Sequence, residues 1–581
     1  MSKTILPDYD VAIVGGGASG IYTAWRMLLE GKDHSPKIKK WMKERKGKLK
    51  IAVFEGSDRI GGRVLSAKAP GLPDLVCEIG GMRYVSSQKL VRSLVENKFN
   101  FARHQQPVDE MNNICFLRGK RLRTGDLTDP KKLPYKLSKK EKKWLSKTPY
   151  KNTASNFLSY AIREVLPGID NPSLLEDGKM REWLMEQVDP NTRAPLYKTG
   201  FWNLIAPVLS NEAYQLAITT IGYDCLGFNT NAVDTICELF DFTPDVQYYL
   251  LNDGYESLIW RMQEEFENEN GEIFRGMWLK SFDNKELDDG STQVEMEFRK
   301  EDSMKTVKTL TSRAIVLAMP QRSLNLLERK GPVFDENRAS SNVKYMLNSV
   351  EPIHMYKMFI SYPYAWWEKK GVSEGRSLTD IPVRQCYYWG EEKGSKNDPE
   401  NKNAILMVYD DGKQADYWGG LRHRPLGPYD AITDFSHESF TRVHLDHSDQ
   451  DNDQSDLDKK LYANWKGHSA PKDMVLEMHR QLLFMHDIKE KDAPAPMEAA
   501  FMDWSDDPYG GAVHFWNPGY PSTQVMNDII QPVKDFPCYI CGEAYSTNQT
   551  WVEGALQTAE LVLEKFNIPQ PKWITDEPQK T

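Results

Sequence analysis

The stretch YDVAIVGGGASGIYTAWRML, near the start of the chain, constrains the fold more than any other. Val11–Val14 is a short apolar run typical of a buried strand, and Ile21–Leu29 has helical composition. Between them, Gly15, Gly17 and Gly20 match the pattern GxGxxG. The first glycine of that pattern permits a tight turn, the second lets backbone approach a pyrophosphate, and the third lets the helix pack on the strand. The stretch therefore predicts a strand, a phosphate-binding turn and a helix.

A second apolar run, Ile51–Phe54, ends in the acid Glu55. A carboxylate at the end of the second strand accepts from ribose hydroxyls, which favours an adenosine without a 2′-phosphate and leaves NAD and FAD. The helix after the turn starts at Ala18 and Ser19, whose amides we expect to face the phosphates. Lys32–Lys50 is a basic insert that lengthens the usual spacing, and we interpret it as a solvated helix extension and loop.

A second glycine pair separates the two cofactors. Gly61, Gly62 and Arg63 follow Glu55 by a few residues, in EGSDRIGGRVLS. Glycines beside an arginine make another phosphate cradle, which suits a cofactor lying extended through the protein. The pattern therefore favours FAD.

Four motifs together resemble the flavin amine oxidase superfamily. EGSDRIGGR matches its second motif, and CEIGGMRY resembles the loop beside its flavin ring. RAIVLAMP is similar to its third sheet motif, and CGEAYSTNQTWVEGALQTA to its C-terminal motif. The resemblance implies an α/β fold: a Rossmann-like FAD-binding domain of the glutathione-reductase type, a mixed-sheet substrate domain and a helical insertion.

We divide the chain accordingly into three domains. The FAD-binding domain is predicted at residues 8–68, 245–345 and 520–567, the substrate-binding domain at 69–130 and 346–519, and the helical domain at 131–244. Within the last, SNFLSYAIREVL and VDTICELFDF show the three-and-four apolar spacing of amphipathic helices. The acidic stretch Asp446–Lys460 has few apolar residues, which predicts a mobile surface segment without calcium ligands in EF-hand order.

Within the superfamily, three segments resemble L-amino-acid oxidases. In GGMRY, Arg83 matches the arginine that clamps the substrate carboxylate, and a guanidinium presents two parallel donors to such a group. In NAILMVYDDG, downstream of the similar block GRSLTDIP, Tyr409 matches a tyrosine that donates to the same carboxylate. In HMYKMFISYPYAWWE, Lys357 matches the lysine that holds a water against flavin N5, although edge strands also carry exposed lysines.

The resemblance also implies the remaining site residues. Trp551 matches the aromatic residue over the substrate and Trp504 an aromatic residue beside the flavin, while Thr550 stands where the family commonly has glycine. Predicted catalytic residues are Lys357, Arg83, Tyr409 and Trp551. Predicted cofactor contacts are Gly15, Gly17, Ala18, Ser19, Gly20, Glu55, Gly62, Arg63, Gly80, Gly81, Met82, Arg83, Trp504, Gly542, Glu543, Trp551, Val552 and Ala555.

The implied reaction is oxidation of an L-amino acid by hydride transfer from Cα to flavin N5, giving a 2-oxo acid, ammonia and hydrogen peroxide. Three alternatives stay open: a flavin amino-acid 2-monooxygenase that forms an amide, an amine or polyamine oxidase, and a flavin-containing binding or scaffold protein without turnover. No histidine falls in a matched motif, so no general base is assigned. Aromatic residues near the motifs point to apolar or large substrate side chains, whereas Asp224, Asp234 or Glu238 would select basic ones.

Composition limits partners and location. The formal net charge of −9 argues against nucleic acid as the main partner. No apolar run has the length of a membrane span, and no secretory signal is recognised at the N-terminus, so we expect a cytoplasmic protein. Seven cysteines without regular spacing indicate reduced thiols, and Cys538 and Cys541 are interpreted as two core residues on opposite strand faces. We expect no metal site, and the resemblance implies a homodimer or larger oligomer.

Overall fold

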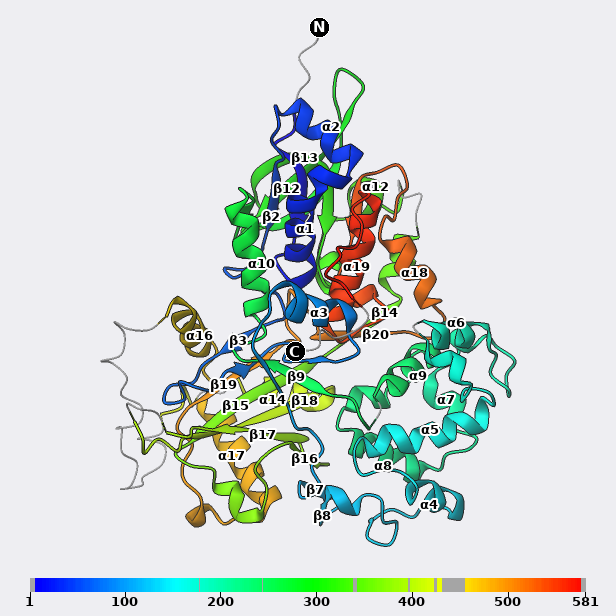
Figure 1. The fold of residues 1–581 in the computed structure, drawn as a ribbon, viewed down its shortest axis with the longest axis vertical. Helices are drawn as coiled ribbons and strands as arrows, with labels where there is room; N and C mark the ends of the chain where they lie inside the picture. The colour runs from blue at the N-terminus through cyan, green and yellow to red at the C-terminus, as the bar shows by residue number, and fades with distance from the viewer. Residues whose placement is uncertain are drawn as a thin grey trace.

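The computed structural model describes residues 6–176, 178–242, 244–337, 342–394, 398–422, 426–430 and 455–575. Figure 1 shows three regions: a sheet with helices against it at the top, a second sheet at the lower left, and a group of helices at the lower right. The predicted α/β class, with a Rossmann-like region, a mixed sheet and a helical insertion, is confirmed. The three domain ranges stay a prediction.

The upper sheet is built on the predicted strand, turn and helix. β1 (Tyr9–Val14) pairs in parallel with β2 (Ile51–Phe54) and β13 (Thr306–Leu317). The sheet is completed by β10 (Glu272–Phe274) beside β2, β21 (Cys538–Ile540) beside β13, and the antiparallel strands β12 (Thr292–Arg299) and β11 (Trp278–Glu286). Because parallel strands end at the same edge, Gly15 and Glu55 emerge next to each other there.

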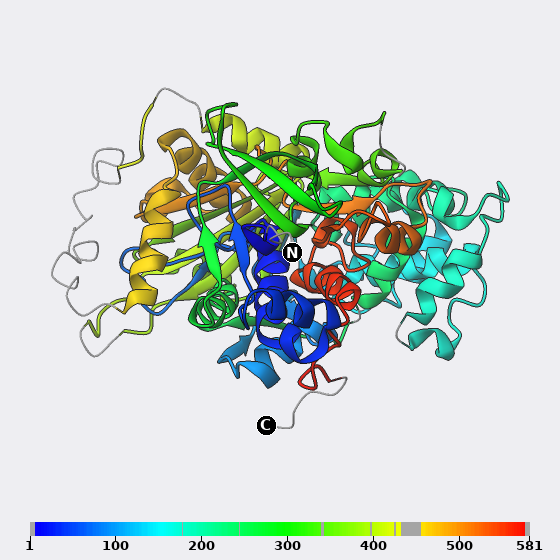
Figure 2. The same cartoon turned by 90° about the horizontal axis from the view of Figure 1, so that it is seen from above.

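Separate apolar cores cover the two faces of this sheet. One contains α1 (Ala18–His34), α10 (Ser257–Asn268) and α19 (Val552–Lys565), which lie on the same side of the strands in Figure 2. The other contains residues of β11 and β12 with α12 (Gly331–Phe334) and α13 (Val343–Leu347). Alternate residues of each buried strand enter alternate cores, as the two-residue repeat of a strand requires.

One sequence prediction is confirmed at these cores, and another is corrected. Cys538 belongs to one core and Cys541 to the other, and both thiols are buried and free. The basic insert was predicted as a solvated helix extension and loop, but α1 ends at His34 and a separate helix, α2 (Pro36–Glu44), follows with a loop at the top of Figure 1. Its N-cap Ser35 accepts from the Ile38 amide, and Ile38 and Trp41 are its buried face.

The lower-left sheet carries much of the predicted substrate domain. Its strand order is β19 (Ala499–Asp503), β15 (Met355–Tyr362), β18 (Ala404–Asp411), β17 (Gln385–Glu391), β16 (Arg376–Thr379), β7 (Ile114–Leu117) and β8 (Lys120–Arg123). Residues of α14 (Lys413–Leu421) and α17 (Lys472–His486) share a buried core with it. α16 (Asp456–Gly467) begins within the acidic stretch, whose residues 446–454 lie outside the described residues.

Short sheets connect the larger regions. Two of them have two strands: β3 (Ser66–Ala67) pairs with β4 (Cys77–Glu78), and β14 (Val350–Ile353) pairs with β20 (Val513–Trp516). In the third, β9 (Tyr248–Leu251) lies between β5 (Tyr84–Val85) and β6 (Arg103–Gln105). The helix α3 (Lys89–Ser93) comes between β5 and β6 in the chain. β9 is a strand inside residues 245–345, yet it pairs with β5 and β6 and not with the upper sheet. It therefore places the loop before β5 next to the helical region.

The helical region forms its own core. Its helices are α4 (Lys139–Leu145), α5 (Thr153–Val165), α6 (Lys179–Glu186), α7 (Phe201–Ile205), α8 (Asn211–Ile221) and α9 (Ala232–Asp241). The two amphipathic helices predicted there are α5 and α9. Across the described ranges, no helix has both the length and the apolar character needed to cross a membrane.

Candidate active site

The glycine turn presents bare backbone to a cavity that runs through the centre of the molecule. Gly15 has φ +111°, and a Cβ there would lie 2.3 Å from the Ala318 carbonyl oxygen. Gly17 is the N-cap of α1, and because glycine has no side chain, no capping group occupies the amides of the first turn. Gly17, Ala18 and Ser19 line the cavity at this end of the helix. Helix N-termini of this kind bind phosphate. Gly20 does not line the cavity: its Cβ would meet the Gly15 carbonyl at 1.9 Å, so its role is close packing of α1.

Glu55 is held at the edge of the same turn. Its Oε2 accepts from the Gly16 amide at 2.7 Å, and its Oε1 accepts from the Ser57 amide at 2.8 Å and the Ser57 hydroxyl at 2.9 Å. A carboxylate has about four acceptor positions, so Glu55 keeps capacity for a ribose hydroxyl while its orientation is fixed.

The second glycine pair lies against the first turn. Gly61 and Gly62 have φ +141° and +58°, and Gly17 forms a parallel bridge with Gly61. Arg63 donates from Nη1 to the Ala512 carbonyl at 2.6 Å and to Glu543 Oε2 at 3.0 Å. The two predicted cradles therefore share one wall of the cavity.

Glu543 joins the C-terminal motif to this wall. Its carboxylate accepts from the amides of His514 and Thr550, each at 2.9 Å, and pairs with Arg63 and with His514 Nδ1. Burial by itself raises the pKa of this carboxyl, but His514, Arg63 and the hydrogen bonds outweigh burial and lower the pKa to about 2. His514 was not anticipated from the sequence, because no motif contains it.

Replacing Glu543 with glutamine is expected to change the acid stability of the protein. The folded-state pKa is depressed, so the stabilisation is fully present above the ordinary pKa of 4.5 and is lost as the pH falls toward about 2. The shift corresponds to a free energy of unfolding on the order of 3 kcal/mol at neutral pH. Thermal unfolding followed by circular dichroism at pH 7 and pH 2.5 should show a difference between the two proteins that shrinks at the lower pH. An equal difference at both values would contradict this account.

The loop after β4 has no room for side chains at Gly80. A Cβ there would lie 2.4 Å from the Arg63 carbonyl oxygen and 2.6 Å from the Leu65 amide nitrogen. Lys357, on β15, donates from Nζ to the Gly80 carbonyl at 2.5 Å and to the Glu78 carbonyl at 3.3 Å, and only 4% of it is exposed. Burial lowers the pKa of Lys357 to about 7, with Glu78 opposing and Arg83 reinforcing the shift.

Arg83 is buried at the end of this loop, with 7% of its surface exposed. Its Nη1 donates to Gln106 at 2.8 Å, and its guanidinium carbon lies 4.1 Å from the centre of the Tyr248 ring. Nε has no hydrogen-bond partner, and Arg83 forms no ion pair with a carboxylate in the described part of the chain. A buried cation of this kind requires an anion.

Aromatic residues enclose the space around Lys357 and Arg83. Tyr409 lies opposite Lys357 on β18; its ring is 4.7 Å from Nζ, and its hydroxyl contacts the Met355 sulfur at 3.3 Å. Trp504 follows β19 and donates to the Ile79 carbonyl at 3.3 Å. Trp551 caps α19, and its ring lies 6.0 Å from that of Phe242.

The backbone conformation at Thr550 explains why glycine is common at this position in the family. Its φ is +72°, in the left-handed region that disfavours a β-branched residue. The Thr550 amide bonds to Glu543, which holds this conformation. Thr550 therefore occupies a backbone conformation that glycine adopts without strain.

Except for Gly20, every predicted catalytic and cofactor-contacting residue lines the one cavity. The cavity extends from Glu55 through the glycine turns to Arg83, and the glycine cradles and helix N-terminus fit a dinucleotide. The roles assigned to individual residues remain proposals. The lining residues that the sequence did not single out include Tyr223, Tyr248 and Arg376, and Glu238 was named as an acid without an orientation. Arg376 lies in the block GRSLTDIP, whose similarity to the family could have identified it as a site residue. Tyr223 and Tyr248 lie in no matched block, so the sequence did not indicate them.

Comparison with known proteins agrees with this geometry. The sequence model of the family described as flavin containing amine oxidoreductase matches residues 18–426. Aplysianin-A from Aplysia kurodai is 23% identical over 96% of this chain and 90% of that protein. L-amino acid oxidase Bs29 from Bothriechis schlegelii is 21% identical over 72% of this chain and 71% of its own length. A structure of putrescine oxidase bound to putrescine superposes with a TM-score of 0.56 at 15% identity, covering 96% and 98% of the two chains.

The fold and the cavity define a flavoprotein, and the family match spans most of the chain. The chain belongs to the flavin containing amine oxidoreductase family. Its cofactor is FAD, which the two phosphate cradles and Glu55 fit.

Proposed function

We propose that the protein is an FAD-dependent L-amino-acid oxidase, which converts an L-amino acid, dioxygen and water to a 2-oxo acid, ammonia and hydrogen peroxide. The observation that carries this proposal is Arg83: a buried guanidinium that faces the cavity without a protein carboxylate. Relatives named L-amino-acid oxidase support the same reading.

Arg83 distinguishes an amino acid from a simple amine. The α-carboxylate of an amino acid supplies the anion that the buried guanidinium lacks, and two parallel donors fix its orientation. Tyr409 and Tyr248 border the same space, so a bound carboxylate is enclosed by aromatic rings and shielded from water. An amine without a carboxylate leaves the guanidinium uncompensated, which makes the amine-oxidase alternative less favourable.

The remaining residues orient the substrate and exclude water. The flavin supplies the two-electron acceptor when it is bound. Trp504 and Trp551 narrow the cavity beside the loop that contains Gly80 and Gly81. Lys357 holds a protonatable amine at that loop, where it positions a water or stabilises negative charge on oxygen.

Lys357→Met tests the role of that amine. We expect amino acid to bleach the flavin anaerobically at a rate within about threefold of wild type, while the colour returns with oxygen at least about tenfold more slowly. Because a cation stabilises developing negative charge, the wild-type return rate should fall as the pH rises through about 7, the pKa of Lys357. The variant should show no such step in stopped-flow absorbance. A step retained in the variant would assign it to another group.

Product analysis tests the reaction itself. The reconstituted protein is mixed with a panel of L- and D-amino acids and their decarboxylated amines, and peroxide, 2-oxo acid, amide and carbon dioxide are counted per substrate consumed. Peroxide and 2-oxo acid in equal amounts from L-amino acids support the proposal. Amide and carbon dioxide indicate the 2-monooxygenase, turnover of amines alone indicates an amine oxidase, and a flavin that no substrate bleaches indicates a binding protein.

We further propose a cytoplasmic homo-oligomer. The seven cysteines are buried and unbonded, which suits a reducing compartment, and the oligomer rests on the family resemblance alone. Light scattering on the purified protein measures the assembly directly.

A further inference from the structure

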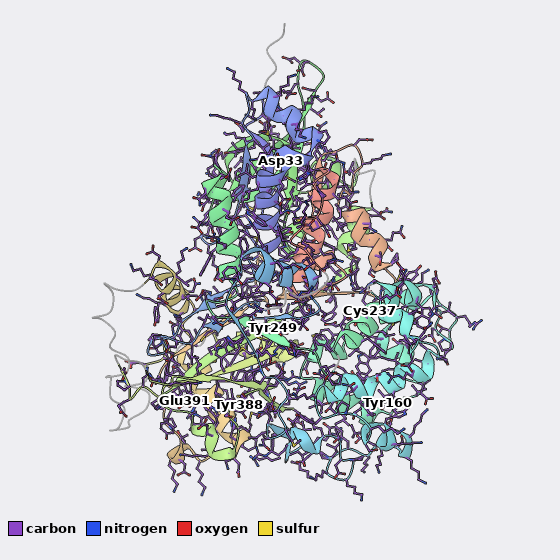
Figure 3. All side chains as sticks on the ribbon, in the orientation of Figure 1. Asp33, Tyr160, Cys237, Tyr249, Tyr388 and Glu391 are labelled. Carbon is purple, nitrogen blue, oxygen red and sulfur yellow. The ribbon has the colours of Figure 1, made fainter. Side chains whose placement is uncertain are left out.

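One carboxylate on the cavity wall has no role in the reaction proposed above. α9 brings Glu238 and Leu239 to the cavity, and Phe242 follows where the helix ends. Figure 3 labels Cys237, the residue before Glu238, on the edge of the helical region nearest the centre of the molecule. The Glu238 side chain makes no hydrogen bond or ion pair with any residue that the structure describes.

The other two acids considered from the sequence are already paired. Asp224 forms an ion pair with Arg384 at 2.7 Å, and Asp234 forms one with Arg181. Neither lines the cavity. Burial, followed by the negative charges of Asp241 and Asp234, raises the pKa of Glu238 to about 8, and Arg181 only partly opposes this. The carboxylate form is therefore disfavoured until a cation enters the cavity beside it.

Glu238 and Arg83 line the same cavity, and two aromatic rings link the region of Arg83 to the end of α9. The Arg83 guanidinium is 4.1 Å from the centre of the Tyr248 ring, and that ring is 6.4 Å from the Phe242 ring. Phe242 comes four residues after Glu238, about one helical turn along α9. A lysine-length chain with a hydrogen bond at each end reaches roughly 12–15 Å, which is long enough to pass from the Arg83 guanidinium over the Tyr248 and Phe242 rings toward α9.

We propose that Glu238 selects substrates with a cationic side chain: the α-carboxylate binds Arg83, and the side-chain ammonium or guanidinium binds Glu238. This inference rests on the proposed oxidase function and names the substrate class of the same site. Tyr248 and Phe242 lie between the two charges and pack against the methylene groups of such a side chain.

The opposite preference, for acidic side chains, would depend on Arg376. That guanidinium also lines the cavity, but its Nε donates to Asp109 at 3.0 Å and its Nη1 to Gln385 at 2.6 Å. Its charge is balanced by Asp109, whereas the charge of an ionised Glu238 is not. The site therefore offers a substrate an unpaired anion, and not a second unpaired cation.

Glu238→Gln tests the inference because it keeps the shape and removes the charge. Wild-type protein should oxidise L-lysine and L-arginine with higher kcat/KM than L-glutamate. The variant should lose about 10–100-fold in kcat/KM for L-lysine and L-arginine and change less than about threefold for L-leucine and L-methionine. Glu182→Gln is the matched control: Glu182 is an acid on α6 in the same helical region, its side chain is 70% exposed, and it does not line the cavity, so its variant should leave all four values within about threefold.

The outcomes separate the two proposals. If wild type oxidises L-leucine but the Glu238 variant keeps its efficiency with L-lysine, the inference fails and the oxidase function stands. An equal loss for all substrates, with normal flavin absorbance, assigns Glu238 a structural role and also overturns the inference. If wild type oxidises no amino acid, the proposed function itself is wrong. Difference absorbance spectra of the flavin with 6-aminohexanoate, which has a carboxylate and a terminal ammonium but no α-amino group, give a second readout: weaker binding to the Glu238 variant than to wild type supports the inference, and equal binding overturns it.

Discussion

Replacing Arg83 with methionine is expected to lower kcat/KM for L-amino acids by about 10²–10³-fold, equivalent to about 3–4 kcal/mol. The side chain is buried, and its charge has no carboxylate partner in the described residues. Methionine keeps an unbranched apolar stem like that of arginine but lacks the guanidinium, so the cavity loses the two donors for the carboxylate. The measurement is peroxide release with several amino acids, together with flavin absorbance, which should stay at the wild-type level.

Two further variants serve as controls for the Arg83→Met result. Arg83→Lys keeps the charge without the planar pair of donors and should show an intermediate loss. Arg261→Met removes an arginine that is 49% exposed on α10 and should leave turnover unchanged. Arg83 would not be the carboxylate site if its methionine variant kept the wild-type kcat/KM. The same conclusion would follow if kcat/KM fell equally for amino acids and for their decarboxylated amines.

Replacing Gly15 with alanine is expected to abolish stable FAD binding. The new Cβ would lie 2.3 Å from the Ala318 carbonyl oxygen, which is backbone and has no flexible side chain to move aside. Gly15 also has φ +111°, which alanine disfavours. We expect a loss of about 2–4 kcal/mol in stability and less than about a tenth of the wild-type flavin content after reconstitution. Absorbance and thermal unfolding with added FAD measure both.

Gly47→Ala is the matched control for this variant. Gly47 has φ +88°, but nothing lies within 4 Å of the Cβ that alanine would add. It therefore carries the backbone strain without the collision, so its variant should be slightly less stable and fully yellow. Equal loss of flavin in both variants would show that the positive φ angle alone reduces FAD binding. The collision with the Ala318 carbonyl, just after β13, would then not be the cause.

Local sequence was sufficient for the parts of this protein that depend on backbone conformation. The turn from Gly15 to Gly20, the acid at Glu55 and the amphipathic helix α19 follow from residue type and spacing, because close approaches and positive φ angles permit few alternatives. The second glycine pair with Arg63 favoured FAD, and the four motifs in their order carried the resemblance to the flavin amine oxidase superfamily. The opposite faces of Cys538 and Cys541 followed from the two-residue repeat of a strand.

The pairing of side chains across the cavity was decided only by the tertiary structure. Sequence alone offered Asp224, Asp234 and Glu238 as equivalent acids, but two of them meet arginines on other elements and one meets none. His514 contacts Glu543 although 29 residues separate them. Whether a charge is neutralised depends on which partner the packed chain brings within hydrogen-bond distance, and neither residue type nor spacing contains that information.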